Sequence, residues 1–250
     1  MIFYITTHSK NIKYAEAIKE MFKGTDYKFY FVYGNNQQNK VEPYIEVDCE
    51  ELYENLPLKT FRIFEHFLNS SYDKMIKMDD NVFLDFKKFH PEDYNQDYVG
   101  MFISCNQDIR SKVHHYYKVS SEDYKIPMKT FDLEYAQGSC YILSRKATRV
   151  CIDHGIEFFK NTPETYLGED IRVGLCLSLA EITKLNLFEY NKILYETAKD
   201  LMIIHPIHFL VYPKLFQSKS NQETLNILSS LNFLNENLKR NIYLDSVIDV

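Results

Sequence analysis

The chain has 250 residues, of which 45% are hydrophobic and 26% are charged, as in an ordinary globular protein. This length suits a single α/β domain or a domain with a helical appendage. A net charge of −6, without any basic run, argues against nucleic acid as the main partner.

The first part of the chain alternates strands and helices. Residues 1–5 form an apolar run that predicts a buried strand. Apolar residues at helical spacing predict a helix over residues 12–22, and Gly24 ends it. Further strands are expected at residues 27–33 and 45–47. This β-α-β opening predicts a parallel sheet of the kind found in nucleotide-binding folds.

The remaining elements follow the same two periodicities. A helix is expected over residues 58–68, after Asn55 and Pro57, which both favour helix initiation. Strands are expected at residues 75–78, 99–104, 141–143 and 202–204, and helices at residues 171–180 and 224–238. We therefore divide the chain into an α/β domain over residues 1–215 and a C-terminal helical extension over residues 216–250. The extension is expected to pack on the domain or at a homodimer interface.

The cysteines and the start of the chain indicate a reducing compartment. Five cysteines are scattered without metal-ligand spacing, and we interpret them as reduced, mostly buried thiols. The first residues lack a charged region followed by a long apolar run, so they fit a strand rather than a signal peptide. No apolar stretch reaches the length needed to span a bilayer. We expect a cytoplasmic protein, or one held at a membrane surface.

An acidic turn follows the strand at residues 75–78. Asp79, Asp80 and Asn81 stand at the edge where open α/β sheets bind their ligands. Consecutive oxygen ligands suit a hard divalent ion such as Mg²⁺ or Mn²⁺. Such an ion can clamp a diphosphate and stabilise it as a leaving group. The same residues are also common in solvated turns, so the turn by itself leaves both interpretations open.

Four segments match one family in order and spacing. The first two are L-Y-E-N-L-P-L-K-T at residues 52–60 and K-M-D-D-N-V-F-L at residues 77–84. The other two are Q-G-S-C-Y-I-L-S-R at residues 137–145 and L-G-E-D-I-R-V-G-L-C at residues 167–176. Together they resemble the sequence blocks of glycosyltransferase family 31, the β-1,3-galactosyltransferase and Fringe-like family.

The resemblance implies a GT-A fold, with a Rossmann-like, mainly parallel central sheet flanked by helices. It also implies a UDP-sugar donor, a divalent metal (Mn²⁺ or Mg²⁺) and inversion at the anomeric carbon. The expected reaction transfers a hexose or N-acetylhexosamine to a hydroxyl of a glycan or glycolipid, in a β-1,3-type linkage. The family's arginine-rich N-terminal block and membrane anchor are not found here, so we expect a bacterial or viral enzyme that works in the cytoplasm.

The family's acidic pair assigns the catalytic base. In the fourth block this pair supplies the base, which makes Asp170 the expected base and Glu169 its alternative. Acids at the start of a helix are also favoured by the helix dipole, whatever their function.

The resemblance also assigns the metal ligands. They are expected to be Asp79, Asp80 and Asn81, with His205 as a distal ligand, because H-P-I-H at residues 205–208 resembles the F-H-S-H region of Fringe-like members. A histidine after an apolar strand is more often a hydrogen-bonded core residue, and His208 is the alternative ligand. The family's third turn acid is Asn81 here, whose carbonyl can coordinate a cation but brings no charge.

The donor is expected to contact three kinds of residue. The first βα turn approaches the base and ribose, basic side chains face the diphosphate, and a glycine turn lets the backbone approach the sugar. The residues assigned to nucleotide-sugar binding are Thr6, Thr7, Lys59, Arg62, Lys77, Asp79, Gly138 and Ser139. Taken singly, the basic residues are more often surface charges, and Gly138 and Ser139 could form an ordinary turn.

Three hypotheses remain at this level. The first is a metal-dependent hexosyltransferase. The second is a transferase of the same fold that uses basic side chains without metal. The third is a sugar-binding or scaffold protein that has lost activity, as Asn81 hints.

Overall fold

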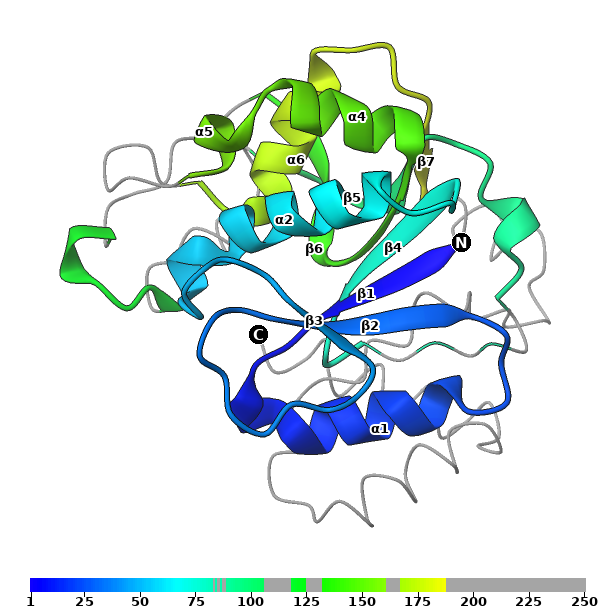
Figure 1. Cartoon of the computed structure of the whole chain (residues 1–250). Helices are drawn as coiled ribbons and strands as arrows, with labels where there is room; N and C mark the ends of the chain where they lie inside the picture. Colours follow the sequence, from blue (N-terminus) through cyan, green and yellow to red (C-terminus); the bar gives the residue numbers. More distant parts are fainter. Residues whose placement is uncertain are drawn as a thin grey trace, which may run out of the picture.

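A mixed sheet with helices on both faces forms the centre of the computed structural model (Figure 1). The structure describes residues 1–82, 84, 86, 89–105, 118–124, 132–160 and 167–187. Within these residues the sheet has seven strands in the order β3-β2-β1-β4-β6-β5-β7. The GT-A-like α/β architecture that the sequence predicted is therefore confirmed.

The first four strands are parallel and bring their carboxyl ends to one edge. They are β1 (Ile2–Thr6), β2 (Lys28–Tyr33), β3 (Tyr44–Glu46) and β4 (Lys74–Asp79). All five residues of β1 are buried, as expected for a central strand with both faces covered. Thr6 at the end of β1 pairs in register with Asp79 at the end of β4, so the first turn and the acidic turn are neighbours.

Among the three later strands of the sheet, β6 runs against the direction of the others. The three are β5 (Tyr98–Ser104), β6 (Glu134–Ser144) and β7 (Lys184–Asn186). Strand β6 runs antiparallel between β4 and β5, with Lys77 opposite Tyr141 and Met78 opposite Cys140. Because β6 crosses the sheet in this direction, Gly138 comes to the same edge as the acidic turn.

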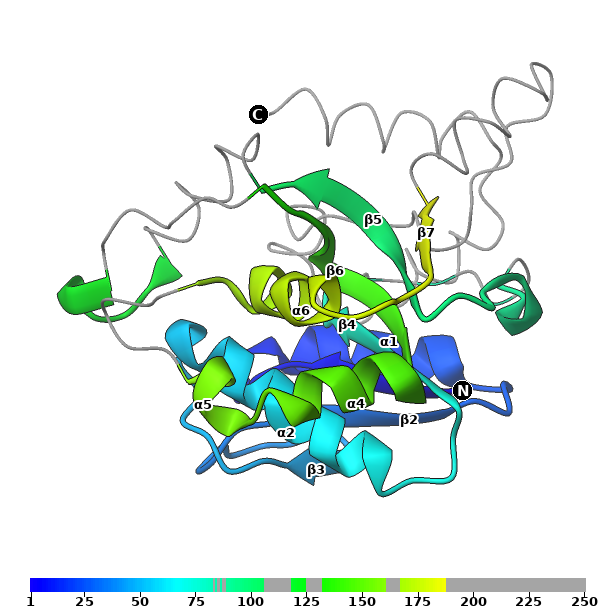
Figure 2. The same cartoon turned by 90° about the horizontal axis from the view of Figure 1, so that it is seen from above.

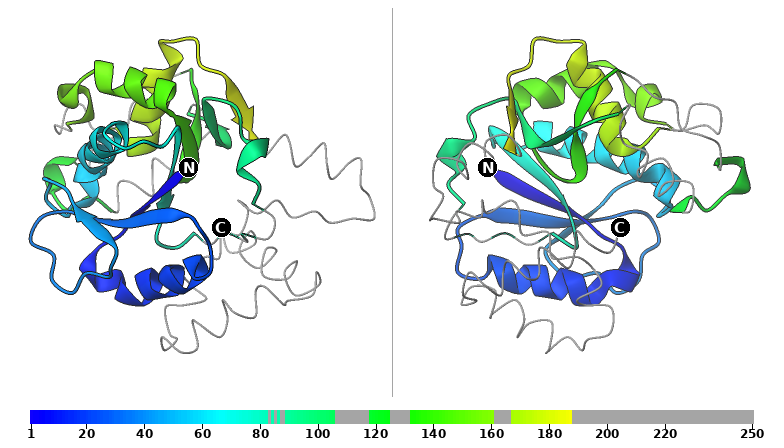
Figure 3. Two further views of the ribbon diagram at one scale, coloured as in Figure 1. Left: turned by 45° about the vertical axis from the view of Figure 1, so that its right-hand side comes forward. Right: turned by 180° about the vertical axis from the view of Figure 1, so that it is seen from behind.

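The helices cover the two faces unequally. Helix α1 (Ile12–Phe22) lies on one face of the sheet (Figure 3). Its buried side chains form a cluster with Phe3 and Ile5. On the opposite face lie α2 (Leu56–Leu68), α4 (Arg145–Asp153), α5 (Ile156–Phe159) and α6 (Glu169–Ser178), as Figure 2 shows. Their aromatic core includes Phe61, Phe64 and Phe159.

Helix α6 approaches β6 closely because residue 174 has no side chain. A Cβ atom at Gly174 would lie 2.5 Å from the Cβ of Tyr135, well inside van der Waals contact. The start of α6, with Glu169 and Asp170, is thereby held against the strand that carries Gly138. None of the helices in the described part of the chain is long and apolar enough to cross a membrane.

Most predicted elements over residues 1–187 are confirmed, and two helices and a strand are additions. Helix α4 was not predicted because its buried face consists of the small residues Ala147, Thr148 and Cys151, which leave no strong apolar stripe. Short α5 and β7 are held by packing on their neighbours. The strand at residues 202–204, the helix at residues 224–238 and the domain boundary at residue 215 lie outside the described residues.

Candidate active site

The acidic turn is fixed to the end of β1 by hydroxyl groups. Thr6 Oγ1 donates a hydrogen bond to Asp79 Oδ1 at 2.9 Å, and Thr7 Oγ1 donates one to Asp80 Oδ2 at 2.7 Å. Asn11 Nδ2 also donates to Asp80 Oδ2, at 2.8 Å. Asp80 is therefore held toward the start of α1, whereas the side chain of Asp79 is 40% exposed. Burial raises the pKa of Asp80 to about 6.

Lys77 joins the acidic turn to the opposite side of the site. Its side chain is 4% exposed, and its Nζ lies 2.8 Å from Asp79 Oδ1 and 3.6 Å from Glu169 Oε2. Nζ also donates a hydrogen bond to the carbonyl oxygen of Gly138, at 2.5 Å. Burial opposes the positive charge, but Asp79 and Glu169 outweigh it and raise the pKa of Lys77 above its ordinary value. Lys77 is thus a charged, internal link between β4, β6 and α6.

The two acids at the start of α6 have different surroundings. Glu169 is buried, and it accepts a hydrogen bond from the hydroxyl of Tyr141. Asp170 is only partly buried, and it accepts hydrogen bonds from the N–H groups of Gly138 and Ile171, both at 2.9 Å. Burial raises the pKa of both carboxyl groups, and the charge of Glu169 helps to bring that of Asp170 to about 7. A carboxyl group with this pKa can exchange a proton near neutral pH.

Gly138 leaves room for this acidic pair. A Cβ atom there would lie 2.8 Å from Glu169 Oε2 and 3.3 Å from Asp170 Oδ2. The glycine therefore permits its N–H and C=O groups to contact Asp170 and Lys77 directly. Asp79 and Asp170 belong to one continuous network, in which Lys77 and Gly138 are the intermediate members.

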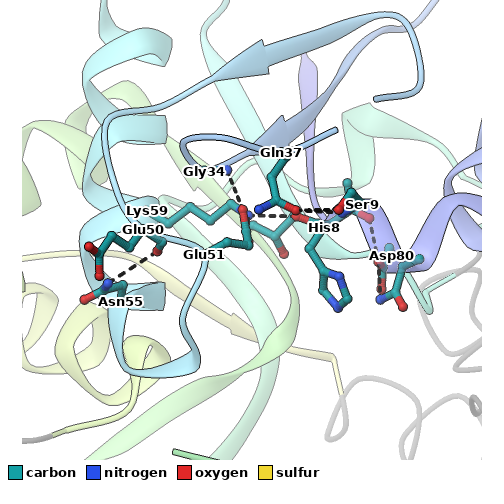
Figure 4. Close-up of polar contacts among 12 residues, drawn as sticks. His8, Ser9, Gly34, Gln37, Glu50, Glu51, Asn55, Lys59 and Asp80 are labelled. Atoms are coloured by element: carbon teal, nitrogen blue, oxygen red, sulfur yellow. Dashed lines mark hydrogen bonds and ion pairs between the residues drawn. The ribbon is translucent and has the colours of Figure 1, made fainter. Parts of the chain in front are cut away.

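Lys59 has its charge compensated inside the fold. It is 2% exposed, and its Nζ lies 2.8 Å from the carbonyl oxygen of Thr7 and 2.5 Å from Glu51 Oε1 (Figure 4). Glu51 Oε2 in turn accepts a hydrogen bond from the N–H of Gly34, at 2.5 Å. Lys59 therefore ties α2 to the ends of β1 and β2, beneath the turn expected to receive the nucleotide.

Arg62 and Ser139 are placed outside this network. Arg62 Nη1 lies 2.8 Å from Glu65 Oε2, one turn along α2. It also lines an open depression of about 390 Å³ with Ile45, Glu46, Val47, Asp48 and His66. Ser139 follows Gly138 in β6 and is partly buried.

The sequence model described as galactosyltransferase matches residues 19–187, about two thirds of the chain. The chain belongs to the galactosyltransferase family. No curated protein sequence matches it significantly. Among solved structures, a similar one is the crystal structure of a glycosyltransferase involved in the glycosylation of the major capsid of PBCV-1. It has a TM-score of 0.46 and 12% sequence identity, over 91% of this chain and 98% of that chain.

As a member of the galactosyltransferase family, the chain is a glycosyltransferase. The acidic turn is its candidate site for a divalent cation. Asp79 is an exposed carboxylate, and the Oδ1 atom of Asn81 is buried without a hydrogen-bond partner among the described residues. Carboxylate and amide oxygens are the donors that Mn²⁺ and Mg²⁺ accept, so the turn fits such an ion. The described residues contain no cluster of three His, Cys, Asp or Glu side chains arranged for a metal, and His205 lies outside them.

Sequence reasoning did not single out several residues that lie in or near the candidate site. Tyr141, Asn11 and Glu51 support the acids or Lys59, and each becomes apparent only when the strands are paired. Lys118 was also missed, because nothing in its local sequence marks it. Its Nζ lies 5.3 Å above the ring of Tyr53 in the short helix η2 (Tyr53–Asn55).

Proposed function

We propose that this galactosyltransferase-family protein transfers a hexose or N-acetylhexosamine from a UDP-sugar to a hydroxyl group of a glycan or glycolipid, with inversion. The observation that carries the proposal is the network joining Asp79 to Asp170 through Lys77 and Gly138. The network supports a proton acceptor in Asp170, next to a turn that we propose binds a diphosphate and its cation. These are the groups that direct displacement at an anomeric carbon requires.

Asp170 is the proposed general base. Its pKa of about 7 lets it take the proton of the acceptor hydroxyl near neutral pH. The hydroxyl oxygen then forms a bond to the anomeric carbon, while the bond between that carbon and the diphosphate oxygen breaks. The N–H groups of Gly138 and Ile171 orient the carboxylate and stabilise its charged form.

Glu169 has a positioning role in this proposal. One of its oxygens accepts from Tyr141, the other faces the ammonium of Lys77, and the side chain is 6% exposed. An acceptor hydroxyl would have to displace these partners to reach it. Glu169 therefore holds Lys77 and raises the pKa of Asp170, which is the base itself.

The cation and the donor complete the proposed site. Asp79 and Asn81, with Asp80 and His205 as further candidates, would hold Mn²⁺ or Mg²⁺. When bound, the ion supplies positive charge for the departing diphosphate. Thr6 and Thr7 stand at the turn proposed to receive the nucleotide, and their hydroxyls are directed to the acidic side chains. Lys59 and Lys77 act by fixing the frame of the site, since both are paired with carboxylates.

The Asp170→Asn variant tests the base. We expect it to keep donor binding and to lose transfer by a factor of about 10²–10⁴, the usual contribution of a general base. The measurement is UDP release from a panel of UDP-sugars with glycan acceptors, and donor binding is followed by calorimetry. Asp153→Asn, at an exposed position, is the control and should behave as wild type. Retained transfer in Asp170→Asn would remove that residue from the role of base.

The same assay separates the alternative hypotheses. Turnover that Mn²⁺ stimulates and EDTA abolishes supports the metal-dependent reaction. Turnover insensitive to EDTA supports the metal-independent alternative, which the substitution of Asn81 for a third acid favours. Folded wild-type protein that binds UDP-sugars without releasing UDP would support the sugar-binding alternative and contradict the proposed transfer.

A further inference from the structure

Lys118 precedes two residues whose positions are fixed by contacts on two sides. The N–H of Ser120 donates a hydrogen bond to Glu54 Oε2 in η2, at 3.2 Å. Val119 is buried in an apolar cluster that includes Leu133 of the loop before β6 and Ile171, the residue after Asp170. The backbone around Lys118 is therefore anchored between η2 and the start of α6. Its position is set by packing, although the residue as a whole is exposed.

The aromatic ring of Tyr53 restricts the ammonium group further. Nζ lies 5.3 Å from the ring centroid, within the range of a cation–π contact. Such a contact favours a defined direction for an otherwise flexible side chain.

The charges of Asp79 and Asp80 act on Lys118, but neither acid forms an ion pair with it. Burial lowers the pKa of Lys118, and the charges of Asp79 and Asp80 act in the opposite direction. No carboxylate in the described part of the chain lies within 4 Å of its Nζ. Lys77 and Lys59 differ, because each has a carboxylate oxygen within 3 Å. A cation that pairs with no carboxylate of the described residues is available to a ligand.

We infer that Lys118 binds the diphosphate of the donor and neutralises it as the leaving group. This inference rests on the proposed function, because it concerns the same nucleotide-sugar site. The basic residues predicted for this task, Lys59, Lys77 and Arg62, already pair with acids of the fold. Lys118 brings its charge from beside Tyr53, and in this inference it contacts phosphate oxygens of a donor whose cation is held by Asp79. It would share this neutralisation with a metal ion whose ligand Asn81 contributes no charge.

The test compares a ligand that has the diphosphate with one that lacks it. Binding of UDP in the presence of Mn²⁺ is measured by calorimetry, and binding of uridine by ligand-detected NMR, for wild type, Lys118→Met and Lys118→Arg. We expect Lys118→Met to weaken UDP about tenfold and to leave uridine unchanged, as loss of one charge-assisted contact predicts. Lys118→Arg should bind UDP within about threefold of wild type, because it keeps the charge.

Lys28→Met is the matched control. Its Nζ lies 4.9 Å above the ring of Tyr30, so it loses the same kind of lysine–tyrosine contact, at the end of β2 remote from the acidic turn. It should bind both ligands as wild type does, and thermal unfolding confirms that all variants are folded.

Each other outcome has a definite meaning. UDP binding by Lys118→Met equal to that of wild type overturns the inference and leaves the proposed function intact. Equal weakening of UDP and uridine also overturns it, since that result indicates a structural role. Wild-type protein that binds no nucleoside diphosphate overturns the UDP-sugar proposal, and the role of Lys118 with it.

Discussion

Lys77 shows how a buried charge can organise the candidate site through its contacts with the fold. Its ammonium contacts a carboxylate of the acidic turn, a carboxylate of α6 and the carbonyl oxygen of Gly138. Removal of any one of these partners would leave a buried charge less well compensated, which is costly. The arrangement holds Asp79 and Glu169 at fixed positions, and Asp170 is fixed in turn through the N–H of Gly138.

Gly138 is the residue at which this arrangement is most easily disturbed. A methyl group there would meet Glu169 Oε2 at 2.8 Å and Asp170 Oδ2 at 3.3 Å, so Gly138→Ala must displace the acids. We expect the transfer rate to fall by roughly 10- to 100-fold, because a displacement of about 1 Å has effects of this size. The free energy of unfolding should fall by about 1–3 kcal/mol. Enzyme assays and urea unfolding measure the two effects.

Gly100→Ala provides the comparison for this effect. Its Cβ would lie 2.5 Å from the Cβ of Ala136, so it overpacks the sheet between β5 and β6. It should lower stability by a similar amount and keep the transfer rate of the folded protein. Equal losses of rate in the two variants would show that Gly138 matters only for folding.

At the scale of elements, the sequence predicts the positions of helices and strands that have a clear apolar repeat. It does not predict features that depend on contacts between distant residues. The strand before Asp79 and the helix after Gly168 were placed within two residues, because apolar repeats define them. The antiparallel entry of β6, which brings Gly138 to Lys77, leaves no mark in the local sequence. Lys59 was expected to face the diphosphate, yet it is buried against Glu51, and only the folded chain shows that partner.

Helix α4 buries only small side chains, which is why the sequence did not predict it and why it depends on its N-cap. Ser144 Oγ accepts a hydrogen bond from the N–H of Ala147, at 3.1 Å, and donates one to Asp97 Oδ1, at 2.7 Å. Since the helix has little apolar surface to bury, we expect Ser144→Ala to lower the free energy of unfolding by about 1–2 kcal/mol. Chemical denaturation measures this change, with the transfer rate unaffected.

A second serine serves as the control for the cap. Ser178 Oγ donates only to the carbonyl oxygen of Leu175, inside the last turn of α6, and it is exposed. Ser178→Ala should change stability by less than about 0.5 kcal/mol. If the two variants were equally stable, the cap of α4 would contribute nothing measurable.

At the scale of the whole molecule, the reversal of strand direction divides the proposed work. The parallel strands β1 and β4 lead into Thr6, Thr7 and the acidic turn, which are proposed to receive the nucleotide and its cation. The antiparallel strand β6 and helix α6 bring the proposed base to the same edge. The carboxylates of the acidic turn and those of α6 therefore lie close together, in a protein whose net charge is already −6. Such a concentration of negative charge should cost stability when it is fully ionised.

This cost predicts a pH dependence of stability to which Asp170 contributes. Burial and the charge of Glu169 raise the pKa of Asp170 from its ordinary value of 3.8 to about 7 in the folded protein. Because the folded state holds this proton more tightly than the unfolded state, the contribution is stabilising at low pH. It is fully present below a pH of 3.8 and is lost as the pH rises through about 7. Wild type should therefore lose on the order of 3 kcal/mol relative to Asp170→Asn between these limits.

Urea unfolding of both proteins between about pH 4 and pH 8 measures this difference, since asparagine does not titrate. We expect Asp170→Asn to gain stability relative to wild type steadily across this range. Asp153→Asn, at an exposed position, should keep a constant difference from wild type throughout. A constant difference for Asp170→Asn as well would mean that the folded carboxyl group has an ordinary pKa, which would also weaken its case as the base. A steady gain would show that the fold gives up stability at neutral pH to keep a proton acceptor beside the acidic turn.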